Sequence, residues 1–438
     1  MNYREATEFL FNSLPMYQRV GKAAYKADLV NTLRLDAALG HPHLKFPSVH
    51  VAGTNGKGSV SHMLASVFQQ AGFKTALYTS PHLLDFRERI RVNGKPVPEK
   101  EVVDFVTRHK RIIGMISPSF FEMTVAMAFD FFARQQVEMA VIETGLGGRL
   151  DSTNIITPVL SVITNVSMDH TEFLGNDLSS IAREKGGIIK KGIPVVVGRA
   201  DGEREKLFRH MAWEKQAEIT FASRTFIPSF HTITPEGKIM LRYTDALSGK
   251  EETEGTVVCD LAGDYQHENL MTLLTVLMKL RESGLDIPQE AAENGLSAVS
   301  VNTGLLGRWQ TVDHNPRSIC DVAHNQEGIA AVMKQLMQLP WKSLHIVFGL
   351  VSDKDLSAIL PLLPGGATYY FTPSSVPRSM DATLLQAEAE KRGLKGRVFP
   401  SVEEAYRAAR RRAEAEDVIF TGGSTFVVAD LLKSLGSR

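Results

Sequence analysis

Short apolar runs alternate with longer amphipathic segments along most of the chain. In the first half, the runs that resemble strands are residues 46–51, 75–78, 139–142, 159–163 and 194–197. In the second half they are residues 318–322, 345–348, 367–371 and 418–420, with helical patterns between them at 384–391 and 402–413. Such alternation is typical of βαβ units around a parallel sheet. The pattern therefore predicts an α/β fold.

Two regions depart from the alternation. Residues 1–46 predict two helices, the second marked by an approximate apolar stripe at Val30, Leu33, Leu35 and Leu39. Residues 220–260 contain threonines, glycines and short alternations of polar and apolar side chains. They predict an antiparallel hairpin beside the main sheet.

A change of pattern near residue 300 divides the chain. Helical patterns at 268–282 and 289–298 are followed by a less regular stretch, residues 300–304, and then by the second alternating block. We therefore expect a larger α/β domain over residues 1–298 and a smaller one over residues 299–438. A chain of 438 residues is long enough for two such cores.

Composition narrows the functional classes. Lys plus Arg and Asp plus Glu both total 49, so the formal net charge is zero, which disfavours a dedicated nucleic-acid binder. The two cysteines, Cys259 and Cys320, cannot form a disulfide framework and suggest a reducing compartment. No signal peptide and no apolar run of membrane-spanning length is recognisable. These features predict a soluble, cytoplasmic protein without membrane or nucleic-acid partners.

The sharpest motif is a glycine-rich turn between a strand and a helical pattern. It consists of Gly53, Thr54, Asn55, Gly56, Lys57, Gly58 and Ser59. Amides of such a turn and the positive end of the next helix form an anion cradle, and Lys57 would contact the terminal phosphates. The strict P-loop spacing is not kept, because Gly58 occupies the place of the metal-binding hydroxyl. The coincidence of strand, glycines, lysine and helix still favours nucleotide binding over a ligand-free turn.

A second glycine cluster, residues 145–150, does not predict dinucleotide binding. It follows the strand at 139–142, but Leu150 stands where the third glycine of the nicotinamide-binding fingerprint is required. The residues after it resemble a loop and not the start of a helix. A nicotinamide enzyme is therefore disfavoured.

Polar residues at the ends of predicted strands are candidates for chemistry. Glu143 ends the strand at 139–142, where a carboxylate is well placed to hold magnesium beside a phosphate loop. Asp169 and His170 follow the strand that we predict over 159–166, at the same sheet edge, although a lone histidine is more often structural. Asp321 closes what we predict to be the first strand of the second domain, and His324 follows it. Lys185, by composition alone, resembles a surface charge.

Together, these motifs resemble those of the folylpolyglutamate synthase and dihydrofolate synthase family, within the Mur-ligase-like ATP-dependent ligases. The resemblance covers essentially the whole chain. It is carried by residues 39–42, 50–60, 79–83, 120–123, 143–154, 169–175, 184–190, 263–269, 307–308 and 321–325. Two small departures are Tyr265, where histidine is common, and Leu306, where proline is frequent.

The resemblance implies a P-loop, Mur-ligase-like ATP-binding domain followed by a smaller, Rossmann-like glutamate ligase domain. It also implies a reaction in which ATP phosphorylates a pterin-linked carboxylate and the amino group of L-glutamate attacks the acyl phosphate. The acceptor would be dihydropteroate, reduced folates or both. A carboxylate is a poor acylating agent, and phosphorylation gives it a good leaving group. The implied partners are ATP, L-glutamate and the pterin substrate, with the protein acting as a monomer.

Roles of individual residues also follow from the resemblance. The implied magnesium ligands, for two Mg²⁺ ions, are Ser80, Glu143 and His170, so that Ser80 supplies the hydroxyl that Gly58 lacks. Lys185 matches a lysine that is carbamylated in the family, and Lys57, Lys185 and His170 are the implied catalytic residues. Beyond the phosphate loop, the implied nucleotide contacts are Asn269, Arg308, Asp321 and His324. The implied pterin-binding region comprises Phe121, Glu122, Leu150 and Asp151.

Two alternatives remain open from the sequence. A ligase of peptidoglycan precursors would share the fold and would take a UDP-sugar peptide instead of a folate. A nucleotide-binding switch without ligase chemistry would bind ATP but release no phosphate with any carboxylate and amine. The motifs do not distinguish dihydropteroate addition from folate-tail extension, because both use the same reaction.

Overall fold

The computed structural model describes residues 1–14, 28–234, 236–246 and 254–436, which fall into two compact units. The first unit comprises residues 1–260 and 266–305, and the second comprises residues 261–265 and 306–438. The observed division thus lies beyond the expected boundary at residue 298, and a short earlier segment joins the second unit. Within the described residues, no helix combines the length and apolar character that a membrane crossing requires.

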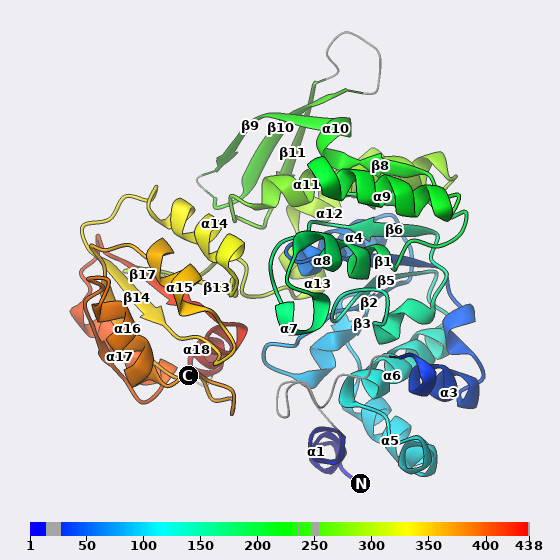
Figure 1. Ribbon diagram of the computed structural model, residues 1–438, viewed down its shortest axis with the longest axis horizontal. Helices are drawn as coiled ribbons and strands as arrows, with labels where there is room; N and C mark the ends of the chain where they lie inside the picture. The colour runs from blue at the N-terminus through cyan, green and yellow to red at the C-terminus, as the bar shows by residue number, and fades with distance from the viewer. Residues whose placement is uncertain (15–27, 235, 247–253, 437–438) are drawn as a thin grey trace. The chain divides into compact units, whose positions relative to one another are not determined.

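The first unit is built on an eight-stranded sheet in the order β4-β3-β2-β5-β1-β6-β7-β8 (Figure 1). The strands are β1 (Ser48–Ala52), β2 (Thr75–Tyr78), β3 (Ile90–Val92), β4 (Lys95–Pro96), β5 (Met139–Glu143), β6 (Leu160–Ile163), β7 (Val195–Val197) and β8 (Ile219–Phe221). All neighbouring strands pair in parallel except at one edge, where β3 pairs antiparallel with both β2 and β4. The central strands β1 and β5 are buried at every position, as expected for a sheet covered on both faces. The predicted α/β class is confirmed.

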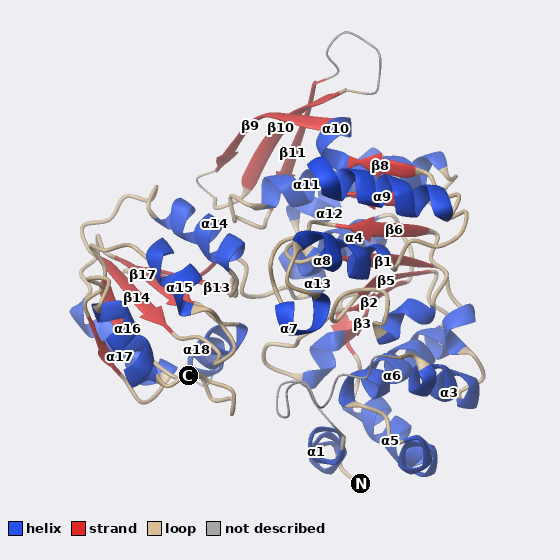
Figure 2. Cartoon of the chain, viewed as in Figure 1, coloured by secondary structure: helices blue, strands red, loops and turns tan. Residues whose placement is uncertain are grey.

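Helices pack around this sheet (Figure 2). They are α1 (Tyr3–Ser13), α3 (Val30–Ala38), α4 (Lys57–Gln70), α5 (Glu99–Ile116), α6 (Phe120–Gln135), α7 (Thr171–Leu174), α8 (Leu178–Gly186), α9 (Gly202–Glu214), α11 (Gln266–Glu282), α12 (Gln289–Ser297) and α13 (Val299–Thr303). Helix α4, which follows β1, packs against β1, β2 and β5 and also against α11, α12 and α13. Phenylalanines of α6 pack with Ala76, Tyr78, Ala140 and Ile142 in one core cluster. The phosphate-loop helix is therefore anchored on the sheet and under a helical layer.

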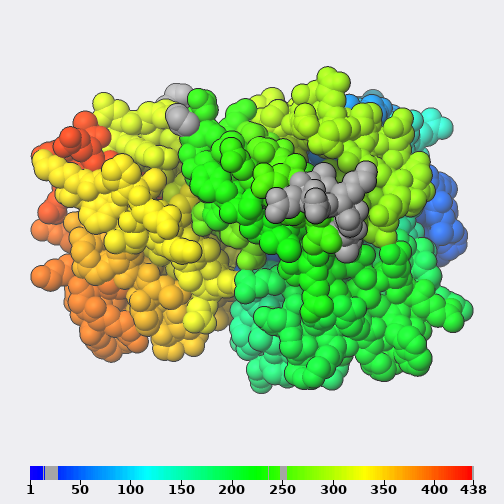
Figure 3. Space-filling model, turned by 90° about the horizontal axis from the view of Figure 1, so that it is seen from above, coloured from blue at the N-terminus to red at the C-terminus, as the bar shows by residue number. Residues whose placement is uncertain are grey.

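Residues 220–260 form more than the predicted hairpin. A short helix, α10 (Ala222–Thr225), leads into an antiparallel sheet of three strands, β9 (Phe226–Ile233), β10 (Ile239–Asp245) and β11 (Glu254–Cys259). The sequence pattern did not predict the third strand, β11, which pairs antiparallel with β10. Strand β9 contacts α11 and strand β11 contacts α12, and Figure 3 shows these green and yellow-green regions side by side.

The second predicted N-terminal helix is present as α3, but two details of local structure in the first unit differ from the sequence pattern. The stripe on the second N-terminal helix does not define its buried face, because Val30 and Leu33 are exposed whereas Leu35 is buried together with Thr32 and Asp36. The stretch at 300–304, expected to be irregular, is largely the helix α13, whose buried Thr303 donates a hydrogen bond to Val299. Tertiary burial of polar side chains overrides the apolar pattern at both places. Of the predicted N-terminal region, residues 15–27 lie outside the described residues.

The second unit contains a six-stranded sheet in the order β12-β13-β17-β14-β15-β16. The strands are β12 (Gln310–His314), β13 (Arg317–Asp321), β14 (Leu344–Phe348), β15 (Thr368–Phe371), β16 (Gly396–Val398) and β17 (Val418–Gly422). The helices are α14 (Gln326–Leu336), α15 (Leu356–Ile359), α16 (Ala382–Glu390), α17 (Val402–Arg412) and α18 (Thr425–Gly436). We expected Asp321 to close the first strand of this unit. It closes the second strand, β13, because β12 precedes β13 and pairs with it antiparallel at the sheet edge.

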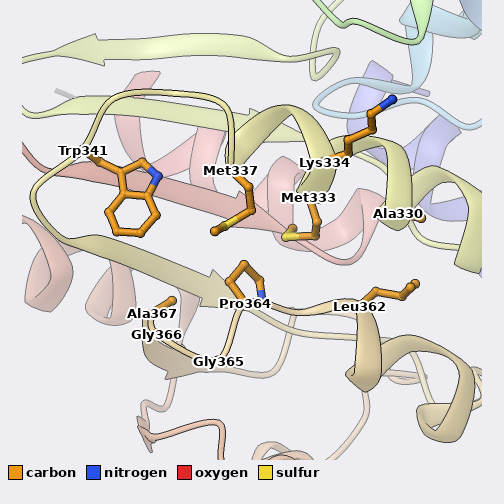
Figure 4. A pocket seen from close by; sticks show the side chains of 10 residues that line it. All are labelled: Ala330, Met333, Lys334, Met337, Trp341, Leu362, Pro364, Gly365, Gly366 and Ala367. Atoms are coloured by element: carbon orange, nitrogen blue, oxygen red, sulfur yellow. The ribbon is translucent and has the colours of Figure 1, made fainter.

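The second unit also holds an apolar pocket of about 360 Å³ (Figure 4). Met333 and Met337, at the end of α14, face the segment around Pro364 across it. None of the residues to which the sequence assigns a role lines this pocket. It is therefore separate from the candidate site described next.

Candidate functional site

The glycine-rich turn lies where β1, β5 and β6 end side by side. Glu143 at the end of β5 is in register with Val51 of β1, and Ile163 at the end of β6 is in register with Ala52. The carboxyl ends of adjacent parallel strands are the usual ligand-binding edge of such a sheet. The strand order therefore brings the turn and the predicted acidic residue to one place.

The backbone of the turn is held by the loop that follows β6. The amide of Thr54 donates to the Asn165 carbonyl at 3.0 Å, and the amide of Asn55 donates to Asn165 Oδ1 at 2.8 Å. Thr164 Oγ1 donates to the Asn55 carbonyl at 2.6 Å. Sequence reasoning missed Thr164 and Asn165, because nothing in their own neighbourhood indicates that they support a loop more than 100 residues away.

Two glycines of the turn cannot be replaced without a clash. A Cβ atom on Gly53, whose φ is +151°, would lie 1.9 Å from Thr164 Oγ1. A Cβ atom on Gly56, whose φ is +84°, would lie 2.1 Å from Asn269 Oδ1. Gly56 also caps α4, and the first amides of any helix lack partners within the helix. The turn thus combines close backbone packing with the first amides of a helix, which is what an anion cradle needs.

Asn269 and Ser59 are joined through Gln266 on the far side of the turn. Asn269 Nδ2 donates to Gln266 Oε1 at 2.7 Å, and Gln266 Nε2 donates to Ser59 Oγ at 3.2 Å. All three side chains are buried. Ser59 and Asn269 were predicted as nucleotide contacts, and Gln266, which was missed, connects them.

Two lysines converge on one carbonyl of the turn. Lys57 Nζ donates to the Gly53 carbonyl at 3.0 Å and to the Thr54 carbonyl at 3.2 Å. Lys185 Nζ, from the last turn of α8, donates to the same Gly53 carbonyl at 2.8 Å. Lys185 is only 3% exposed, so the surface position that composition alone suggested for it is wrong. Burial, reinforced by the nearby Lys57 ammonium, lowers the pKa of Lys185 to about 7.

This shift predicts a pH-dependent stability. Below pH 7 Lys185 is protonated in both folded and unfolded chains; between about pH 7 and 10 only the unfolded chain keeps the proton. The unfolded state then binds more protons, so stability rises with pH. In carbonate-free buffer we expect the free energy of unfolding of the wild type, relative to Lys185→Met, to rise by about 1.4 kcal/mol per pH unit between pH 8 and 9.5. Denaturant titrations at several pH values measure this, and a constant difference contradicts it.

Ser80 and Glu143, two of the predicted metal ligands, lie together. The Ser80 amide donates to Glu143 Oε2 at 3.0 Å, and Glu143 is 4% exposed. His170 precedes α7 as its N-cap residue, in a left-handed conformation, and its Nε2 lies 3.8 Å from Asp169 Oδ2. The strand predicted before it ends at Ile163, so a loop and not a strand end carries His170.

A buried arginine near Glu143 was missed. Arg89 is 3% exposed, and its Nε donates to His82 Nδ1 at 2.8 Å. Burial lowers the pKa of Arg89, and the nearby Tyr78 and Glu143 oppose that shift. In the sequence, Arg89 stands among charged residues and resembles a surface position, so the only available signal was its closeness to the motif at residues 79–83.

The residues expected to bind a pterin fall into two groups. Asp151, which is buried, accepts hydrogen bonds from the amides of Gly145 and Leu146 at 2.8 Å each. The ring of Phe121 covers Gly145 so closely that a Cβ atom there would lie 2.3 Å from it. Phe121 and Asp151 therefore both contact the second glycine cluster, and Leu150, which precedes Asp151 in the sequence, is half-buried.

Glu122 has a structural role at the start of α6. Its Oε2 accepts the Ser119 amide at 2.6 Å, which completes a capping box with the Ser119 hydroxyl. Asn31 Nδ2 lies 3.5 Å from the same oxygen. A capping box stabilises a helix start, and it positions the preceding turn.

In the second unit, Asp321 is the centre of a buried network. Its Oδ2 accepts the Tyr265 hydroxyl at 2.6 Å and the Trp309 amide at 2.7 Å, and its Oδ1 accepts the Ala323 amide at 2.8 Å. Burial raises the pKa of Asp321, and the neighbouring Arg308 guanidinium opposes the shift. The departure at Tyr265 thus has a structural consequence, because its hydroxyl holds the predicted nucleotide-contacting carboxylate. His324 Nδ1 lies 3.0 Å from the Val322 carbonyl.

Models of two protein families match the chain. The Mur ligase middle domain matches residues 51–277, and the Mur ligase glutamate ligase domain matches residues 307–425. The first match contains the phosphate loop, Glu143, Lys185 and Asn269. The second contains Arg308, Asp321 and His324.

Individual relatives agree with these matches. The chain is 31% identical to the dihydrofolate synthase/folylpolyglutamate synthase of Bacillus subtilis, over 94% of this chain and 96% of the relative. It is 30% identical to the folylpolyglutamate synthase of Lacticaseibacillus casei, over the full length of both. It spans 50% of a probable bifunctional folylpolyglutamate synthase/dihydropteroate synthase of Haloferax volcanii. The solved Escherichia coli FolC in complex with DHPP and ADP superposes with a TM-score of 0.84 at 31% identity, covering 100% of this chain and 98% of the other.

Proposed function

This chain belongs to the folylpolyglutamate synthase and dihydrofolate synthase family of ATP-dependent ligases, and from that premise we propose that it joins L-glutamate to dihydropteroate, to reduced folates or to both. One observation carries the proposal. The phosphate loop with Lys57 and the Ser80–Glu143 pair meet at one edge of the sheet. That edge can hold a nucleoside triphosphate and a second reactant whose carboxylate accepts the terminal phosphoryl group of that nucleotide.

Each residue then has a physical task. The first amides of α4, at residues 57–59, and the Lys57 ammonium bind the phosphates of ATP and offset their negative charge. Phe121 and Asp151 form part of the pterin site, the first by its apolar ring and the second by holding the amides of Gly145 and Leu146 in place. In the second unit, Arg308, Asp321 and His324 contact the nucleotide. Phosphoryl transfer gives an acyl phosphate, and attack by the amino group of glutamate releases phosphate and forms the amide.

Magnesium fits the residues that the family implies. Glu143 places a buried carboxylate against Ser80, and hydroxyl and carboxylate oxygens are ligands that Mg²⁺ prefers. Two Mg²⁺ ions held by Ser80, Glu143 and His170 would supply charge neutralisation between the phosphates and the carboxylate. The Ser80 hydroxyl and the Glu143 carboxylate would provide oxygen ligands for the metal, while the Lys57 ammonium contacts the phosphates of ATP from the phosphate loop.

We propose further that Lys185 reacts with carbon dioxide. Its lowered pKa leaves a substantial neutral fraction at physiological pH, and only the neutral amine is nucleophilic. The ammonium first releases one proton. The neutral nitrogen then forms a bond to the carbon of CO₂, one C=O bond of CO₂ becomes C–O⁻, and the nitrogen loses a second proton to solvent, so that a cation becomes a carbamate anion with the release of two protons. Wild-type protein in ¹³C-labelled bicarbonate is expected to show a carbamate resonance that Lys185→Met lacks. A spectrum identical in both proteins contradicts the modification.

A substrate comparison tests the function directly. Purified protein receives ATP, magnesium and L-glutamate with dihydropteroate, with tetrahydrofolate or with a UDP-sugar peptide in parallel. ADP release is expected with one or both of the pterin acceptors, and only when glutamate is present. ADP release with the UDP-sugar peptide alone would establish the peptidoglycan alternative. ATP binding without ADP release under any condition would establish the switch.

A further inference from the structure

A cluster of one carboxylate and two imidazoles lies in the first unit, on residues to which the proposed ligase assigns no role. Asp36 is in the last turn of α3, and His41 and His43 follow in the connection towards β1. His41 Nδ1 lies 2.8 Å from Asp36 Oδ2, and His43 Nδ1 lies 2.7 Å from Asp36 Oδ1. We propose that these three side chains form a binding site for a divalent transition-metal ion of the Zn²⁺ type.

The donor set suits such an ion. Two imidazole nitrogens and one carboxylate oxygen match the three protein ligands of many zinc sites, which leave a fourth position for water. Nitrogen donors favour zinc, nickel or copper over magnesium and calcium. The three ligand atoms all lie within 4.8 Å of one another, and a tetrahedral ion with bonds of about 2 Å needs donors about 3.3 Å apart. Small side-chain rotations are therefore enough to admit the ion.

Burial and charge favour a cation at this place. The side chain of Asp36 is 4% exposed and that of His43 is 13% exposed, whereas that of His41 is 56% exposed. A buried carboxylate is costly unless a positive charge compensates it. Asp36 also sits at the carboxyl end of α3, where the helix dipole favours cations. The exposed side of His41 leaves access from solvent for the ion and its water ligand.

The connection is ordered by its own backbone, independently of the imidazole contacts. The His41 amide donates to the Asp36 carbonyl at 2.9 Å, and the Lys45 amide donates to the Pro42 carbonyl at 3.0 Å. The two imidazole rings stand at 76° to each other with centroids 6.1 Å apart, so both can direct Nδ1 to one point. A preorganised ligand set binds an ion with less ordering cost than a mobile one.

Variants of the two histidines separate metal binding from a hydrogen-bonded clamp. His41 adopts φ +54°, a left-handed conformation that asparagine tolerates well, so His41→Asn removes the imidazole without straining the backbone. His43→Asn removes the second nitrogen ligand. The matched control is His210→Asn, which removes an exposed histidine that also faces a carboxylate, 3.3 Å from Glu214. Glu143→Gln controls for binding at the ligase site.

The experiment titrates Zn²⁺ into metal-free, full-length protein against a chromophoric chelator, with Mg²⁺ and ATP in excess. We expect one zinc ion per chain, with affinity reduced at least about tenfold in His41→Asn and in His43→Asn and unchanged in both controls. Co²⁺ is expected to give the visible absorption of a four-coordinate ion in the wild type and to lose it in both histidine variants. Either no zinc binding, binding that survives both histidine substitutions, or binding that disappears in Glu143→Gln overturns the site.

Discussion

Glu143→Ala is expected to lower glutamate-dependent ADP release by at least about 100-fold, because it removes the carboxylate at the edge where phosphoryl transfer is proposed. Glu143 is buried, and its Oε2 accepts the amide of Ser80, two residues past the end of β2. Steady-state release of ADP with saturating ATP, glutamate and pterin acceptor measures the effect. Circular dichroism and thermal unfolding establish that the variant is folded.

Two further variants separate charge from structure at this position. Glu143→Gln keeps an oxygen that can accept the Ser80 amide but removes the negative charge. If the charge is what matters, Glu143→Gln fails as completely as Glu143→Ala; recovery of activity in Glu143→Gln would mean that Glu143 only orients Ser80. Glu138→Ala is the matched control, because Glu138 is an exposed glutamate just before the same strand, bound to the Lys74 amide. It is expected to retain turnover close to that of the wild type.

Gly53→Ala is expected to destabilise the protein by about 2–4 kcal/mol and to abolish ATP binding in the concentration range where the wild type is saturated. The added Cβ atom would lie 1.9 Å from Thr164 Oγ1, so Thr164 must turn away and lose its hydrogen bond to the Asn55 carbonyl. The turn would then no longer present its amides together. Equilibrium unfolding and calorimetric titration with ATP measure the two effects.

Gly72→Ala provides the control for backbone strain. Gly72 has φ +89° and ends the same helix that Gly56 begins, but a Cβ atom there would meet nothing within 4 Å. Strain alone is expected to cost about 1–2 kcal/mol, with ATP affinity unchanged. If Gly53→Ala binds ATP as the wild type does, the close approach at Thr164 is not what shapes the cradle.

Much of the local structure follows from the sequence because it depends on neighbouring residues. The strand at 75–78 has the predicted bounds, and those at 139–143 and 344–348 differ by one residue at an end. These strands are buried along their whole length, so each stands out in the sequence as a short continuous apolar run. Where a polar side chain is buried by distant partners, as Thr32 and Thr303 are, the apolar pattern is misleading.

The sequence by itself determined that a phosphate-binding turn follows a buried strand, that an acidic residue ends a second strand, and that the chain contains two α/β units. Only the tertiary structure decided that these features meet. The order β2-β5-β1-β6 places Glu143 beside the turn, although the strands succeed one another differently along the chain. Lys185 reaches the Gly53 carbonyl from 132 residues away, and its lowered pKa comes from that burial. Strand order and burial are set by long-range packing, to which the spacing of residues along the chain gives no direct access.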